Sequence, residues 1–210
     1  KLSLNGFEEK RIHCIPTFTA SKTTIGKQQI GSYGLYFGRV TEEKGVETVI
    51  KAYEKLPEYT VKIMGDDTTD EAKRLKKYVE NHKMKNVEFL GFKSGAELEN
   101  VIKGARFTLI PSIWYDNLPN TALESFQYSK PVIASNIGSL PELVIDGENG
   151  YLFKPSNVED LIKKIKMLDD DTLVKKMGQA SRKRLESRFA PQTHYEDLMK
   201  IFNEAVKSRK

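Results

Sequence analysis

Cysteine is almost absent from this chain of 210 residues, in which Cys14 is the only one. A single cysteine excludes an internal disulfide framework and a zinc site built from several cysteines, and it fits the cytosol. No segment approaches the roughly 18 consecutive apolar residues of a membrane helix, and the basic, polar N-terminus lacks the apolar core of a signal peptide. His13, His82 and His194 lie far apart, without neighbouring Cys or carboxylate clusters, so we expect no metal site and a cytoplasmic location.

Excess charge of one sign is absent from most of the chain. Residues 161–210 carry 13 Lys and Arg against 7 Asp and Glu, whereas the first 160 residues carry 21 against 22. The net charge of +5 therefore comes from the C-terminal segment. This segment fits either peripheral contact with anionic lipids at the inner face of the plasma membrane or, as we favour, solvated faces of surface helices. Aromatic residues are not interleaved with these charges, so we expect no nucleic-acid partner.

Segments with the hydrophobic pattern of strands alternate with segments that have the pattern of helices after residue 30. Short apolar segments with the composition of buried strands are 32–37, 60–64, 87–90, 107–110, 131–134 and 151–153. Helical periodicity covers 45–56, 70–82, 97–105, 119–128, 141–145, 157–168, 171–188 and 191–208. Strands separated by crossover helices predict a parallel sheet flanked by helices on both faces. The expected fold class is α/β, with a single Rossmann-like domain.

The first 30 residues differ from the rest. They contain one predicted strand, Arg11–Ile15, and otherwise have the composition of an irregular lead-in or interdomain segment. No repeat, low-complexity run or Gly/Ser-rich linker divides the residues that follow. We therefore predict a lead-in over 1–30, a ligand-binding Rossmann-like domain over 31–190 and a C-terminal helix over 191–210.

The loop after the first predicted strand carries two cations. Gly38 and Arg39 end the strand, and Lys44 and Gly45 open the next helix. Arginine offers phosphate a bidentate fork, and lysine offers it a compact charge. An anion bound at this helix start would offset the unfavourable position of Lys44, and Gly45 would let the anion approach the backbone. Two ordinary surface cations explain these residues equally well.

The loop after the fourth predicted strand combines carboxylates with aromatic residues. Asp116 follows Trp114 and Tyr115, and Glu124 lies about five residues into the next predicted helix, roughly 7 to 8 Å along its axis. This spacing lets both carboxylates face one crevice, with free helix amides between them that favour a phosphate. Each acid alone is explained by the helix dipole, but their joint position favours a ligand site at the carboxyl ends of the strands.

Five segments occur in an order and at spacings typical of one enzyme family. They are FGRVTEEKG at 37–45, VKIMG at 61–65, VEFLGF at 87–92, PSIWYDNLPNTALES at 111–125 and PVIASNIGSLPELVIDGENGYLF at 131–153. With the helical tail they cover residues 10–205, and together they resemble the C-terminal, donor-binding domain of family 4 retaining glycosyltransferases, the C-terminal half of a GT-B fold. The WYDNLP variant is most similar to bacterial surface-polysaccharide transferases.

The resemblance implies a role for each charged residue. Arg39 and Lys44 match the pair that holds the diphosphate of a nucleotide sugar. Glu124 matches the second glutamate of the E-x7-E motif, which contacts the ribose hydroxyls. Asp116 stands at the first glutamate, which contacts the donor sugar, and its side chain is one methylene shorter than the family's. The implied catalytic residues are therefore Arg39, Lys44 and Asp116.

Further donor-binding residues follow from the same resemblance. Gly38 belongs to the implied site beside Arg39. The segment whose backbone contacts the sugar and phosphates is matched by Asn117, Leu118, Asn120 and Thr121. The loop that borders the base is matched by Phe92 and Lys93.

The implied activity is transfer of a hexose or N-acetylhexosamine, with retention, from a nucleotide sugar to a saccharide or lipid-linked saccharide in polysaccharide, lipopolysaccharide or O-antigen biosynthesis. We expect a UDP-sugar and neither a cofactor nor a metal, because the cations would neutralise the leaving diphosphate. The resemblance covers one of two similar halves. We therefore expect an acceptor-binding half to precede it, helix 191–210 to pack on that half, and the fragment alone to bind donor but transfer poorly.

Other functions remain open on the sequence. The domain is also compatible with a non-catalytic nucleotide or sugar-phosphate binding module, or with a transferase of the glycogen or sucrose-phosphate synthase type. A dinucleotide-dependent oxidoreductase is disfavoured, because Gly31, Gly34 and Gly38 do not have the G-x-G-x-x-G spacing.

Overall fold

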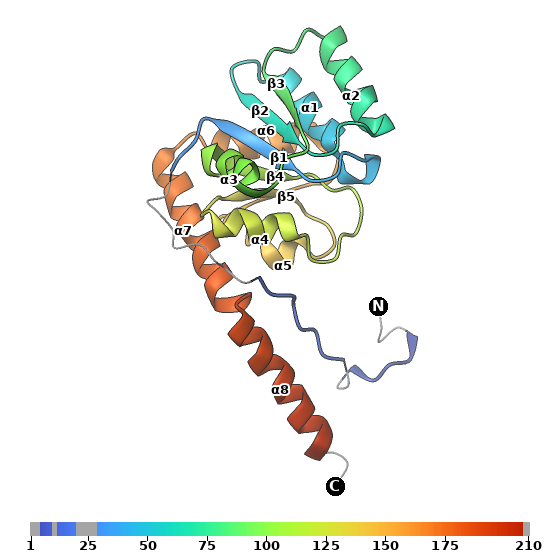
Figure 1. The fold of residues 1–210 in the computed structure, drawn as a ribbon, viewed down its shortest axis with the longest axis vertical. Coiled ribbons are helices and arrows are strands. Elements are labelled where there is room, and N and C mark those ends of the chain that lie inside the picture. Colours follow the sequence, from blue (N-terminus) through green and yellow to red (C-terminus); the bar gives the residue numbers. More distant parts are fainter. Residues whose placement is uncertain (1–4, 10–11, 20–28, 208–210) are drawn as a thin grey trace.

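Six parallel strands form one sheet in the computed structural model, which describes residues 5–9, 12–19 and 29–207. The order is β3-β2-β1-β4-β5-β6, the doubly wound order of dinucleotide-binding domains (Figure 1). The strands are β1 (Tyr33–Phe37), β2 (Thr60–Met64), β3 (Val87–Gly91), β4 (Ala105–Ile110), β5 (Val132–Ser135) and β6 (Gly150–Phe153). The predicted α/β class with a parallel sheet is therefore confirmed.

Helices cover both faces of this sheet (Figure 1). The helical elements are η3 (Glu42–Lys44), α1 (Val46–Glu54), α2 (Asp70–Asn81), α3 (Gly95–Gly104), α4 (Asn120–Gln127), α5 (Leu140–Leu143), α6 (Val158–Met167), α7 (Asp171–Arg188) and α8 (Pro191–Lys207). Alternate residues of β1 face opposite sides: Tyr36 packs with α1, α2 and α6, whereas Leu35 and Phe37 pack with α3. A third cluster joins α4, α5 and the end of α7.

Most predicted elements form within a few residues of the expected bounds. Local caps fix several helix starts: Asn157 accepts a hydrogen bond from the amide of Asp160 at 2.9 Å, and Asp170 accepts one from Thr172 at 2.7 Å. β4 begins two residues early because Ala105 pairs with Tyr33 of β1. The predicted strand Arg11–Ile15 is wrong, since residues 12–15 form no strand, while Arg11 lies outside the described residues.

A buried lysine connects three segments by hydrogen bonds at the amino-terminal edge of the sheet. Lys130 is 2% exposed, and its ammonium donates to the backbone carbonyls of Gln29, Lys103 and Ala105 at 2.8, 2.6 and 2.7 Å. These carbonyls belong to the segment before β1, the end of α3 and the start of β4. One side chain therefore ties three separate segments together at the edge opposite the loops described below.

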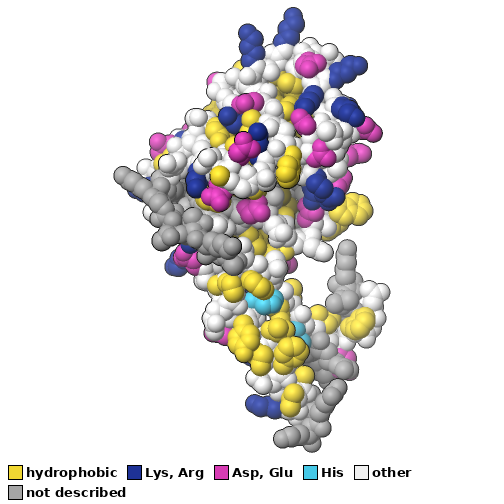
Figure 2. Space-filling model, viewed as in Figure 1, with side chains coloured by type: hydrophobic (Ala, Val, Ile, Leu, Met, Phe, Trp, Pro, Cys, Tyr) yellow, Lys and Arg dark blue, Asp and Glu magenta, His cyan; other side chains and the backbone are white. Residues whose placement is uncertain are grey.

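The C-terminal helix α8 extends away from the sheet (Figure 1). None of its described residues is buried. Residues 12–19 run beside its start, where the ring Nδ1 of His194 lies 2.9 Å from the carbonyl oxygen of Pro16. Hydrophobic side chains gather on this helix, including Tyr195, Phe202 and Val206, each more than half exposed (Figure 2). Among the described residues, no helix is both long and apolar enough to cross a bilayer.

Candidate functional site

The carboxyl ends of β1 and β4 meet at the point where the strand order reverses. β1 pairs with β2 on one side and with β4 on the other, so the loops after these neighbouring strands diverge and leave a crevice. Ligands of doubly wound sheets bind in such crevices. Three adjoining pockets lie here, and Arg39 lines all of them.

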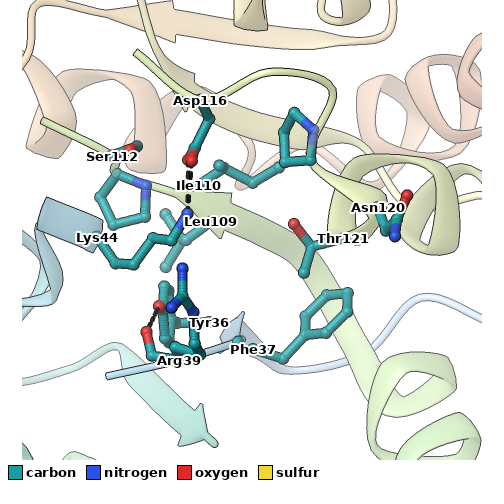
Figure 3. Close-up of a pocket in the computed structure, with 13 residues that line it drawn as sticks. Tyr36, Phe37, Arg39, Lys44, Leu109, Ile110, Ser112, Asp116, Asn120 and Thr121 are labelled. Carbon is teal, nitrogen blue, oxygen red and sulfur yellow. Dashed lines mark hydrogen bonds and ion pairs between the residues drawn. The ribbon is translucent and has the colours of Figure 1, made fainter. Parts of the chain in front are cut away.

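The central pocket lies directly over the ends of β1 and β4. The predicted residues that line it are Gly38, Arg39, Lys44, Asp116, Asn120 and Thr121 (Figure 3). The ammonium of Lys44 lies 2.6 and 2.8 Å from the two carboxylate oxygens of Asp116, and both side chains are about four-fifths buried at 20% and 18% exposure. The guanidinium of Arg39 lies beside Lys44 and points toward this ion pair (Figure 3). Two cations and one carboxylate thus converge on one small space.

A second pocket, the Glu124 pocket, adjoins the central pocket through shared residues. Gly38, Arg39 and Thr121 line both, while Phe92, Lys93 and Glu124 line only the Glu124 pocket among these three. Burial raises the pKa of Glu124 above the ordinary value for a glutamate. No described residue forms an ion pair with this carboxylate, so its acceptor capacity is available to a ligand.

The third pocket, the loop pocket, adjoins the central pocket and has only Arg39 in common with the Glu124 pocket. It shares Arg39, Lys44 and Asp116 with the central pocket. The predicted residues Asn117 and Leu118 line it together with Trp114 and Tyr115. The pockets therefore follow one another in the order Glu124 pocket, central pocket, loop pocket.

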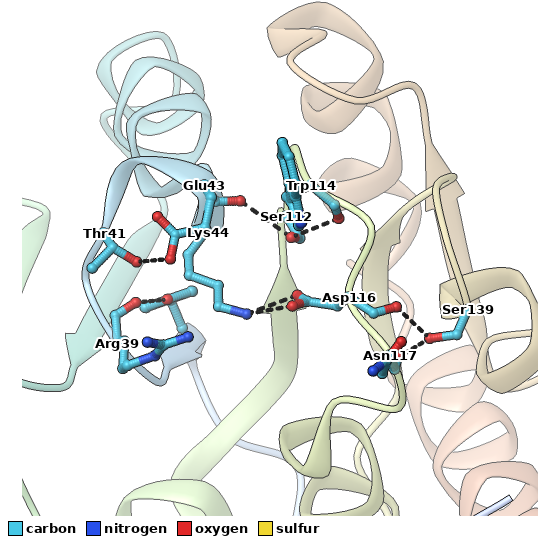
Figure 4. A network of polar contacts seen from close by, with 10 residues as sticks. Arg39, Thr41, Glu43, Lys44, Ser112, Trp114, Asp116, Asn117 and Ser139 are labelled. Atoms are coloured by element: carbon cyan, nitrogen blue, oxygen red, sulfur yellow. Dashed lines mark hydrogen bonds and ion pairs between the residues drawn. The ribbon is translucent and has the colours of Figure 1, made fainter.

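The loop that carries Asp116 is held at both ends (Figure 4). The amide of Ile113 donates to the carbonyl of Glu43 at 3.0 Å, and the hydroxyl of Ser112 donates to the same carbonyl at 3.2 Å. Further along, the hydroxyl of Ser139 donates to the carbonyl of Asp116 at 3.0 Å. These bonds connect the loop to η3 on one side and to the start of α5 on the other, so Asp116 is rigidly positioned.

Gly45 serves packing rather than close approach of an anion. Its φ of +66° is a left-handed conformation that favours glycine, and an added Cβ would lie 2.1 Å from the carbonyl oxygen of Pro111. The backbone of the β4–α4 loop therefore fills the space that the sequence suggested for a ligand. The close fit brings Lys44 to the carboxyl end of β4, where it meets Asp116.

The start of α4 supplies backbone donors between the two carboxylates. Pro119 is the N-cap, one position earlier than the first helical position that the sequence predicted for it. Proline has no side-chain oxygen to cap the helix, and no side-chain cap is formed. The first amides of a helix have no partner within it, so those of Asn120 and Thr121 are available to an anion in the central pocket.

Residues 21–184 match the profile of the family described as glycosyl transferases group 1. The chain belongs to this family.

Individual group 1 relatives extend the comparison. An uncharacterised glycosyltransferase of Methanocaldococcus jannaschii is 30% identical over 174 residues, which are 82% of this chain and 48% of that protein. The glycogen synthase of Mycobacterium tuberculosis is 31% identical over 186 residues, which are 84% of this chain and 42% of that protein. This chain thus spans less than half the length of these curated relatives.

A solved structure shows the same fold. The crystal structure of HepE from Anabaena in complex with UDP and glucose superimposes with a TM-score of 0.74 at 22% identity, over 82% of this chain and 48% of that one. The single α/β domain is thus the fold of one half of a GT-B glycosyltransferase.

All eleven predicted site residues of this group 1 chain line the three pockets, but some of their partners were missed. The sequence did not reveal that Lys44 and Asp116 pair with each other. It also missed Tyr36, whose hydroxyl donates to the carbonyl of Arg39, and Asp66, which follows β2 and lines the Glu124 pocket. Burial and the charge of Asp116 raise the pKa of Tyr36, so this hydroxyl stays protonated as a donor. The position of Asp66 after a strand was a usable signal.

Metal-ligating side chains are spread over the described part of the chain. No three His, Cys, Asp or Glu side chains lie together there in a way that suits a metal ion. The expectation that this family member works without a metal stays a prediction.

Proposed function

We propose that this chain is the donor-binding half of a family 4 retaining glycosyltransferase that binds a nucleotide sugar along the three pockets. One observation carries this proposal: Arg39 lines all three pockets, with the carboxylate of Glu124 at one end and the Lys44–Asp116 pair at the other. A carboxylate accepts from the hydroxyls of a ribose, and an arginine between the two ends suits a diphosphate. This is the order of chemical groups in a nucleotide sugar.

The nucleoside belongs in the Glu124 pocket. Phe92, which is 73% exposed, offers the base an aromatic surface, and Lys93 lines the same pocket. The diphosphate then lies at Arg39 and the first amides of α4, and the donor sugar lies toward Asp116. Charge that develops on the leaving diphosphate is stabilised by Arg39, by Lys44 and by these amides.

The ion pair between Lys44 and Asp116 adds a second function to both residues. An ammonium has three donors, and Asp116 occupies the side of Lys44 that faces the loop. A bound diphosphate therefore competes with Asp116 for the positive charge of Lys44. The pair also holds Asp116 in place for a sugar hydroxyl, which offsets the shorter reach of aspartate.

For the whole enzyme we propose a UDP-sugar donor, a hexose or N-acetylhexosamine as the group transferred, and a saccharide or lipid-linked saccharide acceptor in surface-polysaccharide or O-antigen synthesis. The acceptor would be held in part by a second half, since the relatives are about twice as long as the region that this chain matches. The exposed apolar residues of α8 support docking against that half. The proposed location is cytoplasmic. Peripheral membrane contact through the basic helices has weaker support, because Lys164 and Arg182 already pair with nearby acids.

Calorimetric titration with UDP, GDP and ADP, in the presence of a chelator, tests the donor site. We expect saturable binding of one nucleotide, weakened roughly ten- to hundredfold by Glu124→Ala through loss of a charge-assisted hydrogen-bond pair. Glu80→Ala, which removes an exposed glutamate of α2 outside the three pockets, is the matched control. Unchanged affinity in folded Glu124→Ala protein contradicts the assignment of Glu124, and no binding of any nucleotide contradicts the donor site in this chain.

A transferase of the glycogen synthase type is the second candidate. The 31% identity to the glycogen synthase of M. tuberculosis favours it. Incorporation of labelled glucose into glycogen, by this chain joined to an acceptor-binding half, would support this candidate over a surface-polysaccharide transferase.

A further inference from the structure

Two large aromatic side chains project into solvent from the β4–α4 loop. Trp114 is 64% exposed and Tyr115 is 62% exposed, and both line the loop pocket. Burial of such side chains contributes strongly to stability, and the fold forgoes that contribution here. A pair of exposed aromatic residues in one pocket therefore points to a ligand.

The loop does not owe this exposure to a lack of structure. The amide of Asp116 donates to the carbonyl of Trp114 at 2.9 Å, and the hydroxyl of Ser112 donates to the same carbonyl at 3.2 Å (Figure 4). Together with the bonds from Ile113 to Glu43 and from Ser139 to Asp116, they fix the backbone on both sides of the aromatic pair. A rigid aromatic surface loses little conformational entropy when a ligand binds.

The rest of the loop pocket is polar. Glu43, Lys44, Asp116 and Asn117 line it beside the two aromatic residues. A hydrocarbon surface placed here would desolvate these charges without pairing them, which is costly. A pyranose ring fits better, because its C–H face packs on an aromatic ring while its hydroxyls reach carboxylate, amide and ammonium groups. The pocket therefore has the chemistry of a sugar site.

The place of the loop pocket relative to the other two pockets indicates whether this sugar belongs to the donor or to the acceptor. Trp114 and Tyr115 line neither the central pocket nor the Glu124 pocket. If the donor extends from Glu124 to Asp116, as the proposed function requires, the loop pocket borders both the diphosphate and the donor sugar, because Arg39, Lys44 and Asp116 line it as well as the central pocket. A retaining transfer brings the attacking hydroxyl to the face of the sugar that the diphosphate leaves, so the loop pocket is where an acceptor would lie. We propose that Trp114 and Tyr115 form a stacking surface for a sugar ring of the acceptor saccharide. This inference rests on the proposed function.

The test uses Trp114 itself, because it is the only tryptophan in the chain. Its fluorescence is followed while the 210-residue chain, saturated with UDP, is titrated with the methyl glycosides of glucose, galactose, mannose and N-acetylglucosamine. We expect a saturable spectral change with at least one glycoside and none with UDP alone. Tyr115→Ala is expected to weaken that glycoside roughly three- to tenfold while leaving UDP affinity unchanged. Tyr195→Ala, which removes a similarly exposed tyrosine from α8, is the matched control and leaves both unchanged.

Each outcome has a separate meaning. Binding of UDP without any response to the four glycosides overturns the stacking surface but leaves the donor site standing. A glycoside response without UDP binding contradicts the donor site and keeps the sugar site. In a separate titration without UDP, a fluorescence response to UDP-glucose, together with no response to any methyl glycoside, means that the loop pocket holds the donor's own sugar, which overturns the assignment to the acceptor. Loss of glycoside signals in saturation-transfer NMR of Trp114→Ala provides a check that does not depend on fluorescence.

Discussion

Two lysines stand at opposite edges of the same sheet and are used in opposite ways. At the amino-terminal edge, Lys130 is 2% exposed and directs its ammonium at three backbone carbonyls within 2.8 Å. At the carboxyl edge, Lys44 is 20% exposed and pairs with one carboxylate beside a pocket. Lys130 has all three donors engaged by the fold, whereas Lys44 retains positive charge that a ligand can reach.

The difference separates structural from ligand-directed polar groups in this molecule. Lys130 has no unmet capacity, so it contributes to folding alone. Lys44 and Asp116 are partly solvated, and Glu124 is half-buried without an ion-pair partner among the described residues. Polar side chains whose charge or hydrogen-bonding capacity is only partly used by the fold are therefore concentrated at the carboxyl edge of the sheet. The same contrast can be tested by substitution at each edge.

The largest expected effect is on stability, from Lys130→Met. The change leaves three buried carbonyls without their shared donor, so we expect the free energy of unfolding to fall by about 3 kcal/mol. Burial lowers the pKa of Lys130 to about 8, so the wild-type amine is still mostly protonated at pH 7. Urea denaturation of Lys130→Met and of Lys44→Met measures the contrast. An equally large loss of stability in Lys44→Met, or no loss in Lys130→Met, would contradict the proposed difference between the two edges.

Arg39→Ala gives the next largest effect, on ligand affinity. Because Arg39 lines all three pockets, we expect affinity for UDP to fall roughly ten- to hundredfold while affinity for uridine, which has no phosphate, stays unchanged. Calorimetry with both ligands measures the two effects. Arg74→Ala, which removes an arginine of α2 paired with Glu71 and Glu47, is the control. Equal losses for UDP and uridine would show that Arg39 shapes the site rather than binding phosphate.

Local sequence signals predicted most elements because the forces that form them are local. β2 over Thr60–Met64 has a strand-like sequence, TVKIM, closed by glycine, and α7 over Asp171–Arg188 begins after a capping aspartate, so both have the predicted bounds. The predicted segment at 11–15 shows the limit. Its composition suits a strand, but strand formation needs a neighbouring strand with open hydrogen-bonding groups, and none of the described residues forms one beside residues 12–15.

The sequence predicted which residues line the site, but not which of them contact one another. Asp116 and Lys44 are 72 positions apart, and their pairing depends on the close packing of Gly45 against Pro111, which no local pattern reveals. Lys130 gives no sequence signal at all, since its role arises where three distant segments meet. Residue types and their order along parallel strands locate a site, whereas partners within it depend on tertiary packing.

The two members of the ion pair are expected to respond differently. Lys44→Met removes a positive charge from the diphosphate position, so we expect UDP affinity to fall about tenfold. Asp116→Asn removes a carboxylate that competes with the diphosphate for Lys44, so UDP affinity is expected to stay the same or rise. Calorimetric titration of both variants with UDP compares them. Equal losses in the two variants would mean that the pair acts only by holding the loop in place.

The smallest expected effect is the pH dependence of binding at Glu124. Burial raises the pKa of this carboxyl above its usual 4.5, so the charged form is lost at a higher pH than in an exposed glutamate. The ribose hydroxyls bind the charged form best. The affinity of the wild type for UDP, divided by that of Glu124→Gln, is therefore expected to fall as the pH is lowered from 7 to 5. Taking this ratio at each pH removes the titration of the phosphate, which both proteins share.

The pH dependence of stability provides an independent check on the titration of Glu124. Because the folded-state pKa of Glu124 lies above the unfolded value, the folded protein binds more protons between the two values, and the contribution of Glu124 to stability falls as pH rises through that window. Glu124→Gln is uncharged and lacks this cost, so at pH 7 it should be at least as stable as the wild type. Urea denaturation of both proteins at pH 5 and pH 7 measures this. An affinity ratio independent of pH, with the stability difference present, would show that Glu124 titrates in the pocket but does not contact the nucleoside.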